Sequence, residues 1–217
     1  MVGVTTPRTP RVRMSAPERR AAILAAAMDV FGTRGYHGAS IDDIAQAAGI
    51  SKALIYEHFA SKKDLHASLL DEYAGELFLR LDANAAAGTT GAERLRGGLD
   101  AFFGFVEEHR EAFRVLLRDV ADPEIAQSLA AVQASAVTVV AALMTAAADR
   151  PTPPPGMDAA TFQRAIEMYA AQLSGAVQSL ASWWAEHRDV SRTELVDRAM
   201  EFAWVGLERL GRAAPER

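Results

Sequence analysis

A glycine at position 49 separates two short helical patterns, and this joint constrains the fold more than any other feature of the chain. Before it, Ile44 and Ala48 lie four positions apart, a spacing typical of one helix face. Glycine closes a helix in the left-handed conformation without the steric penalty of a Cβ atom. Ile50 can then fill the gap between the two helices. Residues 41–60 therefore predict two short helices that meet at a tight turn.

Two serines mark the starts of these helices. Ser40 can cap the first, with Asp43 three residues later, and Ser51 can cap the second. The exposed side of the second helix is expected to carry polar and small residues: Lys52, Ala53, Tyr56 and Glu57, with His58 near its end. Any two helices joined by glycine share part of this pattern. The combination of a small residue at 45, a glycine four positions later and both capping serines favours a DNA-binding helix-turn-helix.

The net charge of −5 is unevenly distributed along the chain. Residues 1–66 contain nine Lys or Arg and six Asp or Glu, so they carry a net charge of +3 and the remainder carries −8. A basic N-terminal part on an acidic body suits a protein that binds nucleic acid at one end. Because +3 is small, chance is the alternative explanation.

Several absences narrow the class of protein. The chain has no cysteine, which excludes disulfides and thiol catalysis and predicts a reducing, cytoplasmic setting. No signal-peptide pattern or uncharged apolar run of about 18 residues is evident, so no membrane span is expected. The five histidines show no paired metal spacing, and neither a glycine-rich phosphate loop nor a G-x-S-x-G motif occurs. No metal or cofactor is expected, and an all-α enzyme is only a remote alternative.

The whole chain reads as an all-α protein of about nine helices. Residues 1–14 form a Pro-, Thr- and Arg-rich tail without periodicity, which predicts disorder. The first helix is expected to begin at a capping box of Ser15 and Glu18 and to end at glycines 32 and 35. After the helix-turn-helix, a fourth helix begins at Ser61. Further helices are expected over residues 90–109, 112–118, 122–149, 159–187 and 191–212, with a proline-rich break at 151–156.

Two lysines stand in the first turn of the fourth helix. Lys62 and Lys63 oppose the helix dipole there, because a helix N-terminus favours negative charge. A nearby DNA phosphate would remove the conflict. This position therefore indicates a phosphate contact.

The stretch from Phe31 through Gly35 and Tyr36, followed by GASIDDIAQAAGISKALIYEHFASKKDL from Gly38 to Leu65, resembles the tetracycline-repressor-like (TetR) family of transcriptional regulators. The resemblance covers about fifty residues and includes both aromatics, the helix-turn-helix and the serine–lysine segment after it. The rest of the chain resembles the family in length and helicity alone. The resemblance implies a homodimer that binds a palindromic double-stranded DNA operator through residues 15–60. It also implies that residues 61–217 form a ligand-binding and dimerisation domain, with a small-molecule effector that releases the DNA.

The resemblance also assigns individual DNA contacts. In the family, the positions of Ser40, Lys52, Tyr56, His58 and Lys62 commonly touch phosphate. The positions of Ser51, Lys52 and Ala53 are those that can read bases. Glu57 departs from the family pattern. A carboxylate repels phosphate, although it can accept a hydrogen bond from cytosine N4.

Two further sets of C-terminal residues are candidates for binding. The last two helices carry small residues among large ones, which predicts a dimer interface of Ala176, Leu180, Trp183, Phe202, Gly206 and Leu210. The alternative is that a monomer buries this stripe internally. An apolar effector cavity is expected to include Phe102, Phe105, Phe113, Met144, Phe162, Met168, Tyr169 and Gln172, with Gln133 and Ser174 as further polar candidates. A densely packed core would instead favour a regulator controlled by a partner protein.

Overall fold

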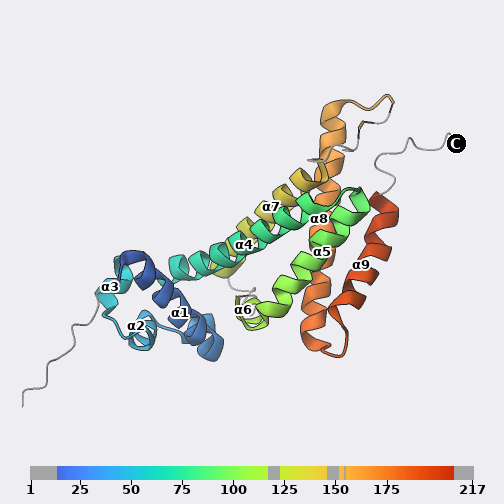
Figure 1. Ribbon diagram of the computed structural model, residues 1–217. Coiled ribbons are helices and arrows are strands. Elements are labelled where there is room, and N and C mark those ends of the chain that lie inside the picture. Colours follow the sequence, from blue (N-terminus) through green and yellow to red (C-terminus); the bar gives the residue numbers. More distant parts are fainter. Residues whose placement is uncertain (1–13, 117–122, 146–151, 154, 208–217) are drawn as a thin grey trace, which may run out of the picture. The chain divides into compact units, whose positions relative to one another are not determined.

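The computed structural model describes residues 14–116, 123–145, 152–153 and 155–207, of which the side chains at 85–86 and 205–207 are not described (Figure 1). Every regular element in these ranges is an α-helix, and there are nine of them. The predicted all-α class is confirmed. The chain divides into two compact units, residues 1–65 and 66–217. The predicted tail at 1–14 lies outside the described residues except for Met14.

The N-terminal unit contains α1 (Ala16–Gly38), α2 (Ile41–Ala48), α3 (Lys52–Tyr56) and the first residues of α4 (Lys62–Ala87). The predicted capping box is present at the start of α1, where the Ser15 side chain accepts from the Glu18 N–H. Gly35 interrupts α1 with φ 69° and ψ 171°, and the element resumes for one turn to Gly38. The core of this unit consists of apolar side chains from α1, α2, α3 and the segment after α3, including Ile23, Phe31, Ile44, Ile55 and Phe59.

The C-terminal unit contains the rest of α4 and five further helices: α5 (Gly91–Glu108), α6 (Arg110–Leu116), α7 (Pro123–Thr145), α8 (Ala159–Glu186) and α9 (Arg192–Leu207). Thr90 and Glu93 form the capping box predicted for α5, and Asp158 caps α8. The ends predicted at residues 118, 149 and 212 lie outside the described residues. Most boundaries that can be compared agree with the predicted ones within about two residues. The exceptions are α1, which continues past the predicted end at Gly35 to Gly38, and α3, which ends at Tyr56 and so before His58.

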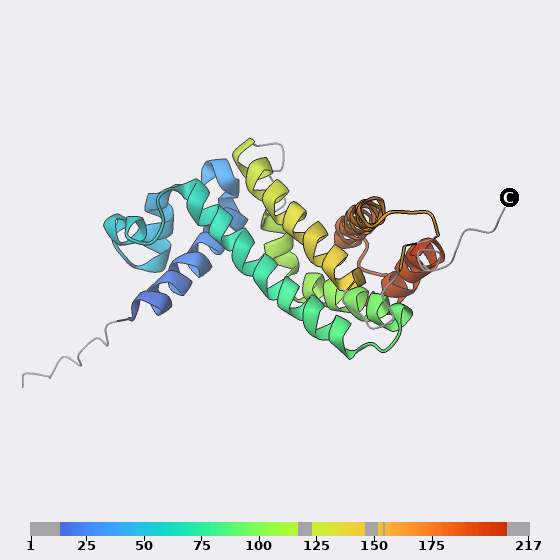
Figure 2. The same cartoon turned by 90° about the horizontal axis from the view of Figure 1, so that it is seen from above.

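Two helix pairs organise the C-terminal unit, α7 against α8 and α5 against α9 (Figures 1 and 2). One core cluster joins α5, α8 and α9 around Phe103, Trp184 and Leu195. The Trp184 indole N–H donates to the Val190 carbonyl at 2.8 Å, which ties the end of α8 to the turn before α9. A second cluster joins α7 and α8 around Ile166.

Helix α7 corrects one expectation about composition. Residues 125–148 contain no Asp, Glu, Lys or Arg, so the chain does hold a long uncharged run. Among the described helices, α7 alone is long and apolar enough to cross a membrane by length and composition. In this fold α7 packs along α8, and its Ala141 joins a buried cluster with Ile166. Only 11% of the apolar window of α7 is buried, so this packing accounts for part of its composition.

Candidate DNA-contact surface and ligand cavity

The turn between α2 and α3 has the geometry that its glycine predicts. Gly49 adopts the left-handed conformation, with φ 66° and ψ 31°, and its N–H donates to the carbonyls of Ala45 and Gln46. The Ile50 N–H donates to the Ala45 carbonyl at 3.1 Å, which completes the closure of α2. Ala45 itself is buried. The chain therefore reverses within three residues and places α3 directly after the turn.

A charged capping network holds the start of α2. The Ser40 hydroxyl donates to Asp43 at 2.6 Å and accepts from the Asp43 N–H at 3.1 Å. The hydrogen bonds that Ser40 donates to the Asp43 carboxyl, from its hydroxyl and from its backbone N–H at 3.0 Å, hold the pKa of that carboxyl below its ordinary value, and Arg34 adds an ion pair at 2.6 Å. Ser40 therefore has a structural role as the helix cap, besides its predicted place at a phosphate.

The exposed face of α3 carries four of the predicted DNA contacts. Ser51 caps the helix through the Leu54 N–H at 3.3 Å. Lys52 and Ala53 are exposed, and Tyr56 retains 49% of its surface. The Lys52 ammonium donates to Asp42 at 2.8 Å, and this hydrogen bond raises its pKa. Because the pair is exposed, Lys52 can exchange the carboxylate for a phosphate at little cost.

His58 follows α3, two residues after Tyr56, and differs from the exposed residues of that helix. It is half-buried, lies against the Phe59 ring, and its Nε2 atom is buried without a hydrogen-bond partner among the described residues. The structure therefore places the predicted phosphate contact at His58 partly inside the unit, whereas Tyr56 projects into solvent.

Lys62 resolves the conflict with the helix dipole in a different way from the one the sequence predicts. Its ammonium donates to the carbonyls of Tyr36 at 2.7 Å and Ala39 at 3.1 Å, at the end of α1. It also lies 4.3 Å from the centre of the Tyr36 ring, a cation–π distance. Cations are favourable at a helix C-terminus. Lys62 is therefore engaged within the unit, where it fastens the start of α4 to the end of α1.

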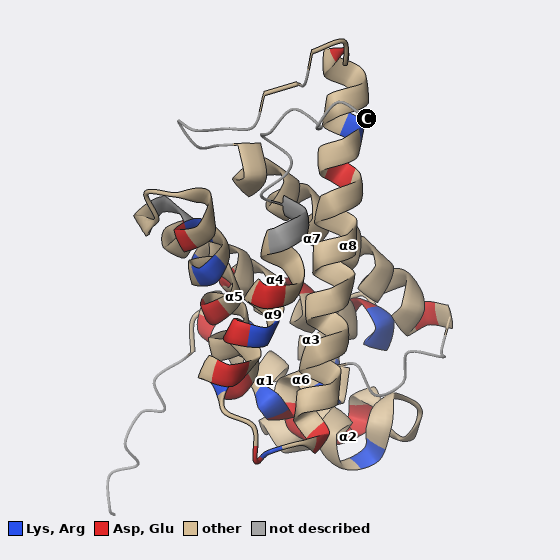
Figure 3. Ribbon diagram, turned by 90° about the vertical axis from the view of Figure 1, so that its right-hand side faces the viewer, with Lys and Arg blue, Asp and Glu red and all other residues tan. Residues whose placement is uncertain are grey.

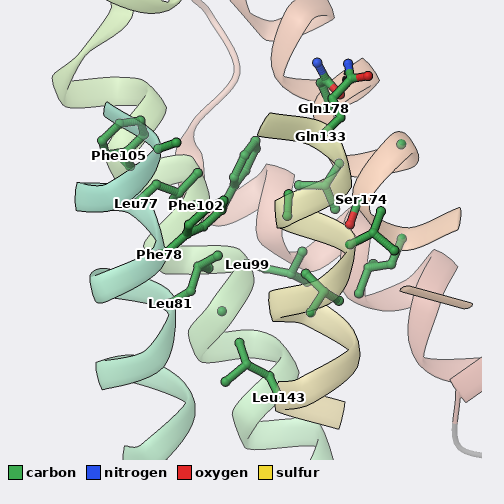
Figure 4. Close-up of a pocket in the computed structure, with 18 of the residues that line it drawn as sticks. Leu77, Phe78, Leu81, Leu99, Phe102, Phe105, Gln133, Leu143, Ser174 and Gln178 are labelled. Carbon is green, nitrogen blue, oxygen red and sulfur yellow. Dashed lines mark hydrogen bonds between the residues drawn. The ribbon is translucent and has the colours of Figure 1, made fainter. Parts of the chain in front are cut away.

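The C-terminal unit encloses a cavity of about 950 Å³. This volume is near the upper end of the range for small-molecule pockets, about 300–1,000 Å³. Helices α4 to α8 supply most of the lining, and Figure 4 shows Phe105, Gln133 and Gln178 toward one end and Leu143 toward the other. The wall is mainly apolar and aromatic, so the cavity suits a long, largely apolar molecule.

Half of the residues predicted for an effector site lie on this cavity. Its lining includes Phe102, Phe105, Phe113 and Met144, together with the polar candidates Gln133 and Ser174. The described lining does not include Phe162, Met168, Tyr169 or Gln172. Phe162 is instead buried in the cluster between α7 and α8.

Helical periodicity explains the misplaced residues on α8. Met168 and Gln172 lie four positions apart on the exposed side of the helix, where Met168 retains 60% of its surface. Ser179 and Trp183 continue the same exposed face at helical spacing. Tyr169 is half-buried beside this face. At about 100° per residue, Met168 and Gln172 lie more than about 90° around the helix from the buried Ile166, which is consistent with their exposure.

The cavity also contains polar groups that the sequence did not single out. Gln178 accepts a hydrogen bond from the Gln133 side-chain amide at 3.2 Å, which joins α8 to α7. Tyr73, Arg94 and His109 lie in the lining as well. No local sequence signal marks these residues, because their contacts join distant parts of the chain: Gln133 and Gln178 are 45 residues apart, and Tyr73 meets the His109 ring from another helix.

A charged cluster stands beside one end of the cavity. Glu76, Glu108 and His109 place three ligand atoms within 4.8 Å of one another, a spacing that could hold a metal ion. The Arg80 guanidinium contacts Glu76 at 2.5 Å and Glu108 at 2.6 Å. Partial burial opposes ionisation of Glu76, yet hydrogen bonds from His109 and Arg80 lower its pKa. Arg80 therefore supplies to these two carboxylates the positive charge that a metal ion would otherwise supply.

The residues predicted for a dimer interface have mixed environments. Trp183 and Phe202 retain 45% and 78% of their surface, whereas Leu180 packs against the core cluster of α5, α8 and α9. Ala176 is half-buried. Leu210 lies outside the described residues, and of Gly206 only its place in α9 is described.

An exposed polar helix on a glycine turn, in a chain whose second unit encloses an apolar cavity, defines a helix-turn-helix transcriptional regulator rather than an enzyme. Two family models match the chain: "Bacterial regulatory proteins, tetR family" at residues 23–69 and "Tetracyclin repressor-like, C-terminal domain" at residues 92–206. The chain belongs to the TetR family.

Individual relatives support this assignment. The transcriptional activator FasR of Mycolicibacterium smegmatis is 30% identical over 200 residues, which are 91% of this chain and 87% of FasR. A TetR-like regulator from Rhodococcus sp. RHA1 is 27% identical with a TM-score of 0.67, covering 90% of this chain and 99% of the regulator. FadR of Bacillus subtilis, solved with stearoyl-CoA, is 20% identical with a TM-score of 0.67, covering 89% and 98%. At that identity the likeness to FadR shows the fold alone.

Proposed function

We propose that the protein binds a palindromic DNA operator as a homodimer in the cytoplasm and releases it when a small, largely apolar effector enters the C-terminal cavity. On this proposal it acts as a repressor. The cavity of about 950 Å³ carries the proposal, because a densely packed core would have favoured control by a partner protein instead. The regulator without an effector is therefore the less favoured alternative.

The DNA-binding part of the proposal is supported by the face of α3. Lys52 and Tyr56 project into solvent from a helix that follows a tightly closed turn. In helix-turn-helix proteins the N-terminal residues of the second helix approach the major groove. Ala53 offers a methyl-sized contact, and Ser51 offers a hydroxyl beside it. Lys52, Tyr56 and Ser40 are proposed to contact phosphates, whereas Lys62 is engaged with the carbonyls of Tyr36 and Ala39 and His58 is half-buried.

The homodimer is supported by the exposed apolar surface of α8 and α9. Phe202, Trp183 and Met168 expose large apolar side chains, and such surfaces mark interaction sites in soluble proteins. A two-fold interface also matches two half-sites of a palindrome. Met168 and Gln172 are reassigned on this basis from the effector site to the proposed dimer surface.

The effector class is supported by the lining and by relatives. Phe102, Phe105 and Leu99 line the cavity together with further aliphatic side chains from α4 and α7. Among the relatives, one is named a fatty acid metabolism regulator and FadR was solved with stearoyl-CoA. We therefore propose a molecule with a long acyl chain. FasR is named an activator, so the direction of regulation needs its own measurement.

The proposal is tested by selecting palindromic DNA from a random pool with the full chain and measuring its binding by fluorescence anisotropy. We expect one dimer per palindrome, an affinity that falls with salt, and release on addition of stearoyl-CoA. The Tyr56→Ala variant should fold normally and bind at least about tenfold more weakly. A reporter gene behind the selected operator then separates repression from activation. Failure to bind any palindrome, or release by no acyl compound, would overturn the proposal.

A further inference from the structure

The wall of the cavity formed by α7 and α8 is uncharged over an unusual length. Residues 125–148 and 168–185 contain no Asp, Glu, Lys, Arg or His. Figure 3 shows α8 without charged residues along most of its length. The charged and titratable groups of the described cavity lining lie on other helices, among them His109 and Arg94. A ligand group that touches α7 and α8 therefore meets amides, hydroxyls and apolar side chains.

Three polar side chains gather on this wall: Gln133 of α7 with Ser174 and Gln178 of α8. We name them the amide–serine corner. Ser174 and Gln178 lie one turn apart and both line the cavity. The Ser174 hydroxyl oxygen is buried and has no hydrogen-bond partner among the described residues. A buried polar atom without a partner costs roughly 1–3 kcal/mol. The oxygen itself is closed to solvent, so the Ser174 side chain must turn toward the cavity that it lines to gain a ligand atom as its partner.

The two glutamines add both kinds of hydrogen-bonding group. Gln133 uses its side-chain N–H on Gln178 at 3.2 Å. This bond occupies one amide oxygen, that of Gln178, and leaves the Gln178 amide nitrogen as a donor and the Gln133 oxygen as an acceptor. Ser174 and Gln178 therefore each keep a donor for a ligand on this wall.

We infer that the amide–serine corner binds an uncharged carbonyl group at the head of an acyl chain, that of an ester or thioester, and discriminates against the free carboxylate. The inference rests on the proposed function, since it concerns the ligand of the same cavity. Beyond the corner the chain would run past Leu99 toward Leu143, which lies toward the opposite end of the cavity (Figure 4).

The charge distribution decides between the two head groups. A carboxylate that leaves water needs a cation or several strong donors, because an unpaired charge is costly to bury. The α7–α8 wall supplies no cation. His109 faces the Glu76 carboxylate at 3.1 Å, and Arg94 lies near the start of α5, by Gly91. An ester or thioester carbonyl needs only the donors that the corner provides.

The exposure of the corner favours a conjugated acyl group. Gln133 is exposed and Gln178 is half-buried, so this end of the cavity opens to solvent. The alcohol or thiol part of an acyl derivative can therefore remain outside while its carbonyl meets Ser174. The opposite end, around Leu143 and Met144, receives the methyl end of the chain.

The test compares decanoate with methyl decanoate at pH 8, where the acid is ionised and chain length is equal. Binding is followed by tryptophan fluorescence, since Trp204 lies in the lining, and by thermal shift. We expect the wild-type protein to bind the ester about tenfold or more tightly than the carboxylate. Ser174→Ala and Gln178→Leu should each weaken ester binding by about three- to tenfold. Gln163→Leu, at an exposed position near the start of the same helix and outside the cavity lining, should leave both affinities unchanged.

The stability of the free protein separates a binding role from a structural one. Ser174→Ala removes a hydroxyl without a partner, so the ligand-free unfolding temperature should stay equal or rise while ester affinity falls. Equal binding of ester and carboxylate, or unchanged ester affinity in both corner variants, would overturn the inference and leave the acyl-binding cavity intact. If neither compound binds and stearoyl-CoA does not release DNA, the inference falls together with the proposed function.

Discussion

Replacing Lys62 with Met tests whether this lysine is a structural fastener or a phosphate contact. The substitution keeps most of the aliphatic stem but removes the ammonium. Two hydrogen bonds from the ammonium to the Tyr36 and Ala39 carbonyls are lost, together with the cation–π contact to the Tyr36 ring. Hydrogen bonds to charged groups contribute about 1.5–3 kcal/mol and a cation–π contact about 0.5–2 kcal/mol. With partial exposure of the side chain, we expect a loss of about 2 kcal/mol, or roughly 10 °C for a unit of this size.

The assay must observe the N-terminal unit separately. All three tryptophans lie at positions 183, 184 and 204, so tryptophan fluorescence reports on the C-terminal unit alone. Circular dichroism follows the helices of both units. We expect Lys62→Met to lower the first transition seen by circular dichroism, with a smaller change in the tryptophan transition.

Lys52→Met is the matched variant, because its ammonium lies on the exposed face and pairs only with an exposed carboxylate among the described residues. It should leave the unfolding temperature almost unchanged, weaken operator binding and reduce the salt slope by about one. The reverse result would refute the structural reasoning: unchanged stability in Lys62→Met together with a reduced salt slope would make Lys62 a phosphate contact.

Two further variants address the turn and the dimer. Gly49→Val forces a β-branched residue to φ 66° and should lower the free energy of unfolding by about 1–3 kcal/mol, although no heavy atom lies within 4 Å of the added Cβ. Gly49→Asn should lose much less stability, because asparagine tolerates this conformation. Equal stability of the two variants would contradict the strain argument. Phe202→Arg should shift the protein from dimer toward monomer in sedimentation experiments. Leu79→Arg, which changes a similarly exposed apolar side chain on α4, should leave the dimer unchanged. A dimer that persists in Phe202→Arg would remove this residue from the interface.

Sequence reasoning located most helix starts, because the signals are local. The Ser15, Ser40 and Thr90 caps act on backbone groups three residues away, and Gly49 acts on its own dihedral angles. These effects need no knowledge of the tertiary structure. The same holds for the buried residues of α3 and of the segment after it, where Ile55 and Phe59 follow helical spacing.

The cavity was only half predictable. Phe102, Phe105 and Phe113 could be singled out as aromatic residues on helices, but whether an aromatic residue lines a cavity or fills a core depends on the helix that packs against it. Phe162 illustrates the second outcome, since it is buried between α7 and α8. Met168 illustrates a third outcome, because it faces solvent.

The sequence by itself determined the helix-turn-helix, because glycine stereochemistry, capping and helical spacing all act within a few residues of the chain. The tertiary structure alone decided the roles that depend on distant partners. Lys62 meets a carbonyl 26 residues earlier in the chain, and Gln133 meets a glutamine 45 residues later. The orphaned hydroxyl of Ser174 is likewise visible only when α7 and α8 are packed together. Such contacts follow from packing geometry, and no local pattern in the sequence encodes them.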